Sequence, residues 1–345
     1  MKVALCCIAK LENEYIREFV EHYRDIGVDK IFIYDNNDKE GERISDAVSD
    51  FIEDGLVDVI DYRGKKLAQK PAYNDCYKKN SKKYDWFLYF DCDEFLEITD
   101  GRDIKKFLSD EKYKPYSSIH VNWMIYGDGG HVKNDGRPLK ERIPEPVKPF
   151  DVKRGYDFPD NNHIKTMVRG GMKVVFEQTP HTPTTKLKTC NCEGKEVKCS
   201  DAFQPYCFDN AYLRHYVTKT IEEYTKKKLN RGSATTPKQK KIMSRDIKGF
   251  VNFFKINEWT VEKQMFINEH VGEMKWVYEM LEAPKSKPNR KERRIIPKRV
   301  VRTARKSGIR TVRPNGNISG NNQIRKRRAI NRSANINTFQ NWNSY

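Results

Sequence analysis

Three carboxylates stand close together at the end of an apolar segment. Asp91, Asp93 and Glu94 directly follow the run Trp86–Phe90. Several like charges at the end of a buried strand are costly without a compensating cation, and carboxylate oxygens select hard ions such as Mg²⁺ or Mn²⁺. Side chains alternate along a strand, so Asp91 and Asp93 would share one side and converge on one ion. The cluster predicts a divalent metal site; the competing interpretation is an acidic turn exposed to solvent.

The residues around this cluster predict alternating strands and helices. Apolar, β-rich runs are separated by stretches in which apolar residues recur at helical spacing, and Gly27 and Gly55 stand where elements end. Units of this kind form a mainly parallel sheet flanked by helices, with ligands at the carboxyl ends of the strands. We expect strands at 3–8, 29–34, 56–62, 85–90 and 116–125, and helices at 15–23, 43–54 and 72–80.

The second half of the chain shows weaker patterns. Residues 167–176 alternate loosely, which predicts a strand near the edge of the sheet. Thr220 and Glu223 have the spacing of a capping box, which predicts a helix that starts there and ends at Gly232. A second helical region is expected from 246 to 281.

The positive charge of the chain is concentrated at one end. The net charge is +18, but residues 285–345 hold 18 Lys and Arg with a single acid, which leaves 48 basic and 47 acidic residues in 1–284. The overall basicity is therefore no evidence that the folded part binds nucleic acid. We expect an α/β domain at 1–235 with a cysteine-containing insertion at 185–210, a helical extension at 236–284, and a largely disordered basic tail at 285–345.

Several segments, taken in order, carry a resemblance to a known family. They are residues 10–19, 34–37, 69 with 72–76, 85–96, 123 with 126–131, and 215–224 with 228 and 231–232. As an ordered set they resemble the nucleotide-sugar-dependent glycosyltransferases of the GT-A (Rossmann-like) fold, most closely family 92 and related family 2 enzymes. The resemblance covers roughly residues 1–235 and implies transfer of a sugar from a nucleoside diphosphate, expected to be UDP, with inversion. The acceptor would be a hydroxyl of a glycan, a lipid-linked molecule or a protein.

The resemblance also implies which residues contact the donor. Asp35 and Asn36, at the end of the second strand, would lie near the base or ribose, and Gln69 would lie on the donor side as well. Glu94 would support the acid pair or face the sugar. Lys219 could reach the diphosphate as a point charge.

The metal, Mn²⁺ or Mg²⁺, would be held by residues from two distant segments. Asp93 would bind it directly, and Asp91 would help with the metal or the ribose. A late histidine often supplies a further ligand in such enzymes; His215 is the first candidate here and His181 the second. The competing interpretation is that either histidine simply packs in the fold.

An inverting transfer needs one carboxylate as general base toward the acceptor hydroxyl. Asp128 lies in the glycine-rich turn 127–130, where the backbone can approach a ligand closely. Glu141 lies where the family has an acidic residue before Arg-Phe, although this chain reads Arg142-Ile143. Both are candidates, Glu141 being slightly favoured, and both could equally be surface acids.

Four cysteines in the insertion allow three interpretations. Cys190, Cys192, Cys199 and Cys207 could bind zinc, form disulfides, or stay free thiols. Their spacing differs from that of a Cys-x-x-Cys zinc knuckle, which favours free thiols.

The basic tail and the N-terminus suggest where the protein acts. The tail 285–345 could contact an anionic membrane surface, could contact nucleic acid, or could have no single partner; no specific nucleic acid is predicted. No signal peptide or transmembrane run is visible, so a cytoplasmic protein is expected. Two other functions stay open: an inactive α/β protein that binds through its tail, and a metal-dependent nucleotidyltransferase.

Overall fold

The protein was analysed as a computed structural model. It describes residues 1–147, 150–151, 156–157, 159–231, 250 and 253–270. The expected helix end at Gly232, residues 246–249, 251–252 and 271–281 of the expected helical region, and the whole basic tail lie outside the described residues.

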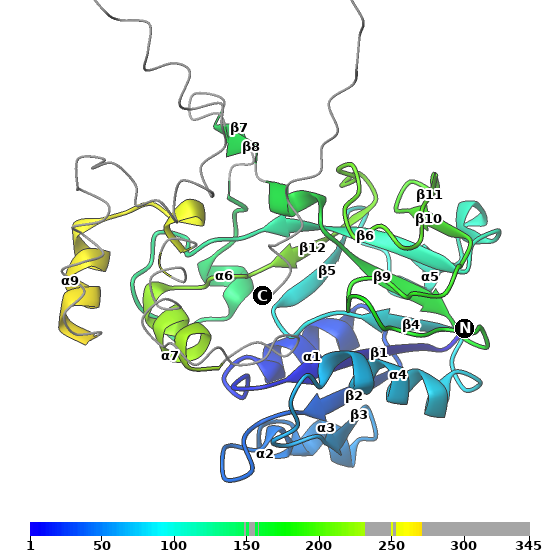
Figure 1. Cartoon of the computed structure of the whole chain (residues 1–345), viewed down its shortest axis with the longest axis horizontal. Coiled ribbons are helices and arrows are strands. Elements are labelled where there is room, and N and C mark those ends of the chain that lie inside the picture. The colour runs from blue at the N-terminus through cyan, green and yellow to red at the C-terminus, as the bar shows by residue number, and fades with distance from the viewer. Residues whose placement is uncertain (148–149, 152–155, 158, 232–249, 251–252, 271–345) are drawn as a thin grey trace, which may run out of the picture. The chain divides into compact units, whose positions relative to one another are not determined.

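The first half of the chain forms the predicted parallel sheet (Figure 1). Its strands run in the order β3-β2-β1-β4, with every neighbouring pair parallel. Gly27 and Gly55 close helices with φ values of +95° and +78°, conformations that favour glycine. The elements are β1 (Val3–Ala9), α1 (Ile16–Asp25), β2 (Lys30–Asp35), β3 (Val57–Asp61), α4 (Gln69–Asn80) and β4 (Trp86–Tyr89).

The helix expected at 43–54 is interrupted. The structure has two short helices, α2 (Ile44–Ala47) and α3 (Ser49–Glu53), separated by Val48. Val48 has φ −133° and ψ 26°, outside the helical region, while its side chain is fully buried. Packing of this valine into the core therefore accompanies a break that the periodicity alone did not reveal.

The strand expected near the sheet edge is in fact central. β9 (Ile164–Arg169) lies between β4 and β6 (Ser118–Ile125) and is antiparallel to both. Five successive residues of β9, from Ile164 to Val168, are buried. The edge prediction is wrong because a strand covered on both faces shows no clean alternation of polar and apolar residues.

The later strands extend and curl this sheet. β10 (Thr189–Asn191) pairs parallel with β6, and β11 (Glu196–Val197) pairs antiparallel with β10. β12 (Ala211–His215) lies parallel to β6 and antiparallel to β5 (Glu94–Ile98). The mixed, mainly parallel α/β sheet is thus confirmed, and the segment 185–210 contributes strands to it.

The remaining elements are short connections and late helices. They are α5 (Ile104–Leu108), η1 (Glu111–Tyr113), α6 (Leu139–Arg142), β7 (Phe150–Asp151), β8 (Tyr156–Asp157), η2 (Pro159–Asn162), α7 (Ile221–Arg231) and α9 (Val261–His270). The predicted capping box is present: Thr220 N donates to Glu223 Oε2 at 2.8 Å, and Glu223 N donates to Thr220 Oγ1 at 3.3 Å. Within the described residues, no helix has the length and apolar character needed to cross a bilayer.

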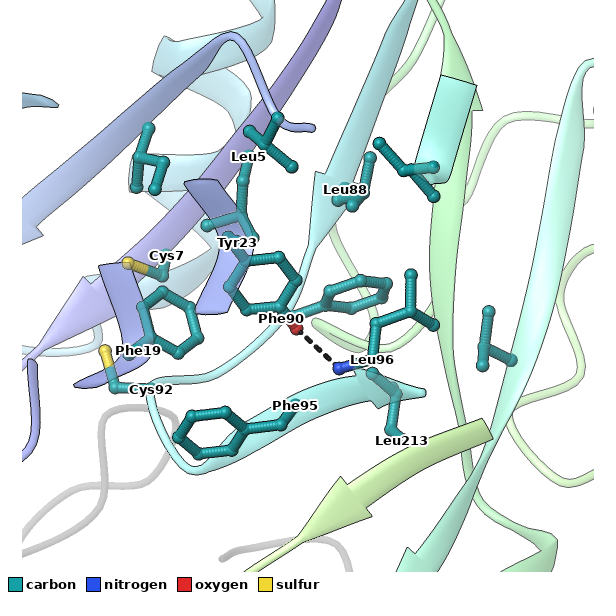
Figure 2. Close-up of a cluster of buried hydrophobic side chains, with 14 of the residues drawn as sticks. Leu5, Cys7, Phe19, Tyr23, Leu88, Phe90, Cys92, Phe95, Leu96 and Leu213 are labelled. Atoms are coloured by element: carbon teal, nitrogen blue, oxygen red, sulfur yellow. Dashed lines mark hydrogen bonds between the residues drawn. The ribbon is translucent and has the colours of Figure 1, made fainter. Parts of the chain in front are cut away.

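Alternation along β1 divides the core between the two faces of the sheet. Leu5 and Cys7 pack with α1, whereas Ala4 and Cys6 pack with α4. Figure 2 shows the first of these clusters, in which Tyr23 of α1 lies among residues of β4 and β5.

The Tyr23 hydroxyl connects this core to the acidic cluster. It donates to the Glu94 carbonyl at 2.8 Å and accepts from Leu96 N at 3.1 Å, the bond drawn in Figure 2. Cys92 and Phe95, which flank Asp93 and Glu94, are buried in the same cluster. The core thus holds the backbone of the acidic segment from within.

Candidate active site

The acidic cluster forms a turn between two strands. β4 ends at Tyr89 and β5 begins at Glu94, and Glu94 N donates to the Asp91 carbonyl at 3.0 Å. The expectation that strand alternation orients Asp91 and Asp93 is therefore wrong, because the chain turns there. The Glu94 carboxylate reinforces the turn by accepting from Asp91 N at 2.9 Å.

A buried lysine compensates the acids. Lys165 of β9 is fully buried, and its Nζ lies 2.7 Å from Asp91 Oδ2 and 3.6 Å from Glu94 Oε1. The other Asp91 oxygen, Oδ1, accepts from Gln69 Nε2 at 2.8 Å and from the Tyr73 hydroxyl at 3.1 Å. Both Asp91 oxygens thus have partners from α4 and β9.

Burial and the lysine act on these carboxyl groups in opposite directions. Burial would raise the pKa of Asp91, but the Lys165 ammonium outweighs it and lowers that pKa. For Glu94, burial outweighs Lys165, and the pKa is raised well above the ordinary value. Burial would lower the pKa of Lys165, yet Asp91 and Glu94 raise it. Asp91 and Lys165 therefore form a charged pair inside the protein.

Asp93 lies beside His215, as the sequence suggested. Their Oδ1 and Nε2 atoms are 3.8 Å apart, and both side chains are buried. The pairing of β12 with β5 brings these segments together, since His215 is opposite Glu94 in that register and Tyr216 N donates to the Asp93 carbonyl at 2.9 Å. The Trp123 ring packs on the His215 ring with centroids 4.2 Å apart.

His181, the second candidate ligand, lies in the same aromatic group. Its ring is 5.2 Å from Trp123 and 5.5 Å from His163. Nδ1 is 3.0 Å from the Ile164 carbonyl, which can only accept, so Nδ1 carries the proton and Nε2 has the lone pair. Burial and then Lys165 lower the pKa of His181 to about 3, which keeps the ring neutral at pH 7.

The donor-side candidates Asp35 and Asn36 support a loop. Asp35 is buried, and its two oxygens accept from Asn37 N at 3.0 Å and Ile44 N at 3.1 Å. The Asn36 side chain donates to the carbonyls of Tyr62 and Lys65 at 2.8 and 2.9 Å. Both residues shape the loop that follows β2.

Lys219 is buried in an unusual backbone conformation. Its φ is +55°, and its Nζ lies 4.5 Å from the centroid of the Tyr15 ring. Within the described part of the chain, no carboxylate forms an ion pair with Lys219. A strained, non-glycine residue that presents an ammonium group is typical of a functional position.

The two candidate bases have different surroundings. Asp128 is buried; its Oδ1 accepts from Gly130 N at 2.8 Å, and the Lys263 ammonium of α9 contacts its Oδ2. Asn257 accepts from Asp128 N at 2.7 Å, so the C-terminal segment holds the glycine-rich turn. Glu141 is exposed on α6.

A buried ion pair fixes Arg142, the residue that follows Glu141. Arg142 makes a bidentate contact with Glu223, and the Tyr15 hydroxyl donates to the same carboxylate at 2.8 Å. Burial would raise the pKa of Glu223, but hydrogen bonds from Arg142 outweigh it and bring that pKa down to about 2. This network links α1, α6 and α7.

The residues of the acidic turn were tested for their fit to a divalent ion. Among the described residues, no group of three or more His, Cys, Asp or Glu side chains is arranged to hold a metal. Asp93 and His215 supply a carboxylate and an imidazole, a donor set that suits Mn²⁺. These two side chains fit an ion that takes its other ligands from a diphosphate and water.

The cysteines of the segment 185–210 are free and buried. Cys192 Sγ lies 3.4 Å from the His120 carbonyl, and Cys199 Sγ lies 3.5 Å from the Thr185 carbonyl. Burial raises the pKa of the Cys190 thiol to about 12. Cys192 and Cys207 also lie within side-chain hydrogen-bonding distance of each other, so the free-thiol, zinc and disulfide interpretations all stay predictions.

Two histidines away from the acidic turn make the fold sensitive to acid. Burial lowers the pKa of His120 to about 3, and burial together with Lys140 lowers that of His22 to about 3. Both would titrate near pH 6.5 in the unfolded chain, so below that pH the unfolded state binds more protons and stability falls. At pH 5 we expect each to have reduced the free energy of unfolding by about 2 kcal/mol.

Urea unfolding followed by tryptophan fluorescence between about pH 7.5 and 5 measures this effect. Over that range the variant His120→Leu should lose about 2 kcal/mol less stability than the wild type, a mean slope smaller by about 0.8 kcal/mol per pH unit. An unchanged slope in this variant would contradict the contribution assigned to His120.

The structure brings five of the eleven sequence-predicted site residues into one region, with His181 nearby on the Trp123 ring. Asp35, Asn36, Lys219, Asp128 and Glu141 have other partners or lie at the surface. Direct contacts join Asp91, Glu94 and Gln69, and Asp93 lies beside His215. Three features were not predicted from the sequence: Lys165 beside Asp91, the packing of Trp123 on His215, and Lys263 beside Asp128. A lysine that follows Ile164 at the start of a strand with apolar Met167 and Val168 was the available signal for Lys165. Lys263 gave none, because its partner lies far away in the sequence.

The fold and the site define the class of protein. A mixed, mainly parallel sheet with acids at the carboxyl end of β4 is the arrangement of a GT-A-type α/β protein. The profile of glycosyltransferase family 92 matches residues 3–297, and the chain belongs to this family.

Two curated relatives are described as glycosyltransferase family 92 proteins. The one from Oryza sativa subsp. japonica is 24% identical over 133 residues, 38% of this chain and 22% of the relative. The one from Ricinus communis is 22% identical over 140 residues, 39% of this chain and 25% of the relative. The match thus spans about a quarter of the length of these relatives.

Solved structures of glycosyltransferases are distantly similar. TarS of S. aureus has a TM-score of 0.36 and 14% identity, covering 87% of this chain and 50% of that chain. The mannosyltransferase PcManGT from Pyrobaculum calidifontis, in complex with GDP-Man and Mn²⁺, has a TM-score of 0.28 and 13% identity over 35% of each chain. Similarity at this level supports no statement about the site of this protein.

Proposed function

We propose that this chain is a metal-dependent glycosyltransferase that moves a sugar from a nucleoside diphosphate, expected to be UDP, to an acceptor hydroxyl with inversion. The observation that carries the proposal is the convergence of Asp93 and His215, 3.8 Å apart, next to an Asp91 held by Lys165. Membership of glycosyltransferase family 92 supports it.

In this proposal Asp93 and His215 hold the ion, and His181 stays a second candidate. A bound Mn²⁺ or Mg²⁺ would neutralise the charge that grows on the leaving nucleoside diphosphate. Lys219 would supply an ammonium group to the same phosphate groups; its Nζ lies over the Tyr15 ring, and no carboxylate among the described residues pairs with it.

The other donor-side residues fix the geometry of the site in this proposal. Both carboxylate oxygens of Asp91 have hydrogen-bond partners, so the carboxylate is held in a fixed position beside the ribose or the ion. The Glu94 carboxylate stabilises the backbone of Asp91 by accepting a hydrogen bond from Asp91 N. Asp35 and Asn36 keep the loop after β2 in the shape that receives the base or ribose.

Asp128 and Glu141 are both retained as candidate bases. Asp128 is buried and fixed by Gly130, Asn257 and Lys263, whereas Glu141 is exposed and can reach an acceptor only at the surface. A fixed carboxylate favours Asp128, because a base must be positioned within hydrogen-bond reach of the proton it removes. The acceptor hydroxyl would belong to a glycan, a lipid-linked molecule or a protein, and the tail 285–345 could bring the enzyme to an anionic membrane.

The proposal is tested by incubating the full chain with UDP- and GDP-sugars in the presence of Mn²⁺. We expect slow release of the nucleoside diphosphate, and loss of this release when EDTA removes the metal. Asp128→Asn and Glu141→Gln, measured with acceptor present, separate the candidate bases by which one lowers the rate of transfer. Release of pyrophosphate instead would indicate a nucleotidyltransferase, and failure to bind any nucleotide sugar would indicate an inactive binding protein.

A further inference from the structure

A hollow with a volume of about 450 Å³ lies on the surface close to the aromatic group of the candidate site. Two segments line it, the end of η2 and the chain before Cys207. The lining residues are Asn162, Phe203, Gln204, Pro205 and Tyr206. No step proposed above uses this hollow.

Buried amides hold both walls of the hollow in place. Asn122 of β6 donates from Nδ2 to the carbonyls of Asn161 and Gln204, at 3.3 and 3.4 Å. Asn161 Oδ1 accepts from Ile125 N at 2.9 Å, and Gln204 N donates to the Asn162 carbonyl at 2.7 Å. Since Asn122 and Asn161 are almost completely buried, the sheet itself fixes the shape of the hollow.

The chemistry of the lining is mixed. Phe203 leaves 41% of its surface exposed, which is unusual for a large aromatic residue. Tyr206 is half-buried and stacks on Phe208 with centroids 5.8 Å apart. The Asn162 side-chain oxygen is buried and has no hydrogen-bond partner among the described residues. Exposed ring faces next to an unsatisfied amide suit a ligand that has both C–H faces and hydroxyl groups.

A row of packed rings connects the hollow to the acidic turn. Phe203 packs on His163 with centroids 4.3 Å apart, His163 on Trp123 at 4.8 Å, and Trp123 on His215 at 4.2 Å. His215 in turn lies beside Asp93. In the described part of the chain, His163 Nδ1 and Trp123 Nε1 also lack hydrogen-bond partners although both are buried. The polar atoms without partners therefore continue from the hollow toward the proposed metal ligands.

We propose that this hollow is the acceptor subsite and binds a pyranose ring of a carbohydrate acceptor, with Phe203 as the stacking face and Asn162 as a hydrogen-bonding group. This inference rests on the proposed glycosyltransferase function. A lipid chain would leave the Asn162 amide unsatisfied, which makes it the less favourable occupant. Acceptor specificity then depends on Asn162 and residues 203–206.

Binding of methyl hexopyranosides to the full chain, in the presence of UDP and Mn²⁺, tests the inference by saturation-transfer NMR. The panel contains both anomers of the common hexoses. Phe203→Ala and Asn162→Leu should each weaken glycoside binding about tenfold, the size of one stacking or hydrogen-bonding contact. Affinity for UDP, measured by calorimetry, should stay within about twofold of the wild type, because neither residue lies on the proposed donor side. Trp259→Ala is the matched control, since Trp259 is an exposed aromatic residue (37%) outside the hollow.

Two outcomes would overturn the inference. One is that no glycoside of the panel binds the wild-type chain, or that both variants bind glycosides as the wild type does. The other is that a polyprenyl phosphate binds in the hollow and Phe203→Ala abolishes this binding. A wild-type chain that binds glycosides through Phe203 but neither binds nor hydrolyses a nucleotide sugar would instead contradict the proposed glycosyltransferase function.

Discussion

Asp93→Asn is expected to abolish metal-dependent release of the nucleoside diphosphate, whereas Asp91→Asn is expected to leave metal binding largely intact. Asp93 and His215 are the side chains placed to share an ion, while both Asp91 oxygens already have partners in Gln69, Tyr73 and Lys165. Loss of a residue that hydrogen-bonds to a metal ligand typically lowers metal affinity 10- to 100-fold. Loss of a direct ligand should therefore lower the affinity for the metal at least about a hundredfold.

The rate of donor hydrolysis should fall roughly a hundredfold to a thousandfold in Asp93→Asn, as when a group that stabilises developing charge is removed. Titration of Mn²⁺ in the presence of UDP, followed by electron paramagnetic resonance, measures binding directly. Asp100→Asn is the control, because Asp100 is an exposed acid paired with Arg102. Wild-type affinity for Mn²⁺ in Asp93→Asn, or loss of Mn²⁺ binding in Asp91→Asn alone, would contradict the assignment.

Lys165→Met is expected to destabilise the fold by about 3 kcal/mol, the low end of the range for breaking a buried pair, because it leaves the Asp91 carboxylate, 31% exposed, without its cation. The variant removes the ammonium group while keeping an unbranched apolar stem of similar length. Urea unfolding at pH 7 measures the loss. Lys105→Met serves as the matched control: Lys105 is 39% exposed and pairs with Asp29 at the surface, so its loss should cost less than about 1 kcal/mol.

The double variant Lys165→Met/Asp91→Asn separates stability from activity. With both charges gone, most of the lost stability should return, because removing a whole buried pair costs far less than removing one partner. The rate of donor hydrolysis should remain about a hundredfold below that of the wild type, since the positioned Asp91 carboxylate is also gone. A double variant no more stable than Lys165→Met would show that the buried charge pair is not the source of the effect.

Much of the fold follows from local sequence patterns. Strands β1, β2 and β4 are continuous apolar runs, helix α1 has apolar residues at helical spacing, and the capping box of Thr220 and Glu223 is a short-range hydrogen-bond pattern. The wrong predictions concern elements whose environment depends on the rest of the chain. β9 reads as an edge strand because its two covered faces hide the alternation, and Val48 breaks a helix while its side chain packs in the core.

The sequence by itself determined that three acids follow an apolar strand and that the chain is an α/β protein, and its resemblance to a known family implied the glycosyltransferase type and offered His215 as a candidate partner of the acids. Only the tertiary structure decided which side chain lies beside each acid. β9 inserts Lys165 between the first and the third acid, and β12 places His215 beside the second. Likewise, Lys263 reaches Asp128 from a helix more than a hundred residues away. The physical reason is that the interaction between charges depends on their distance in space. Residues that are neighbours in space can be far apart in the sequence, where no local pattern connects them.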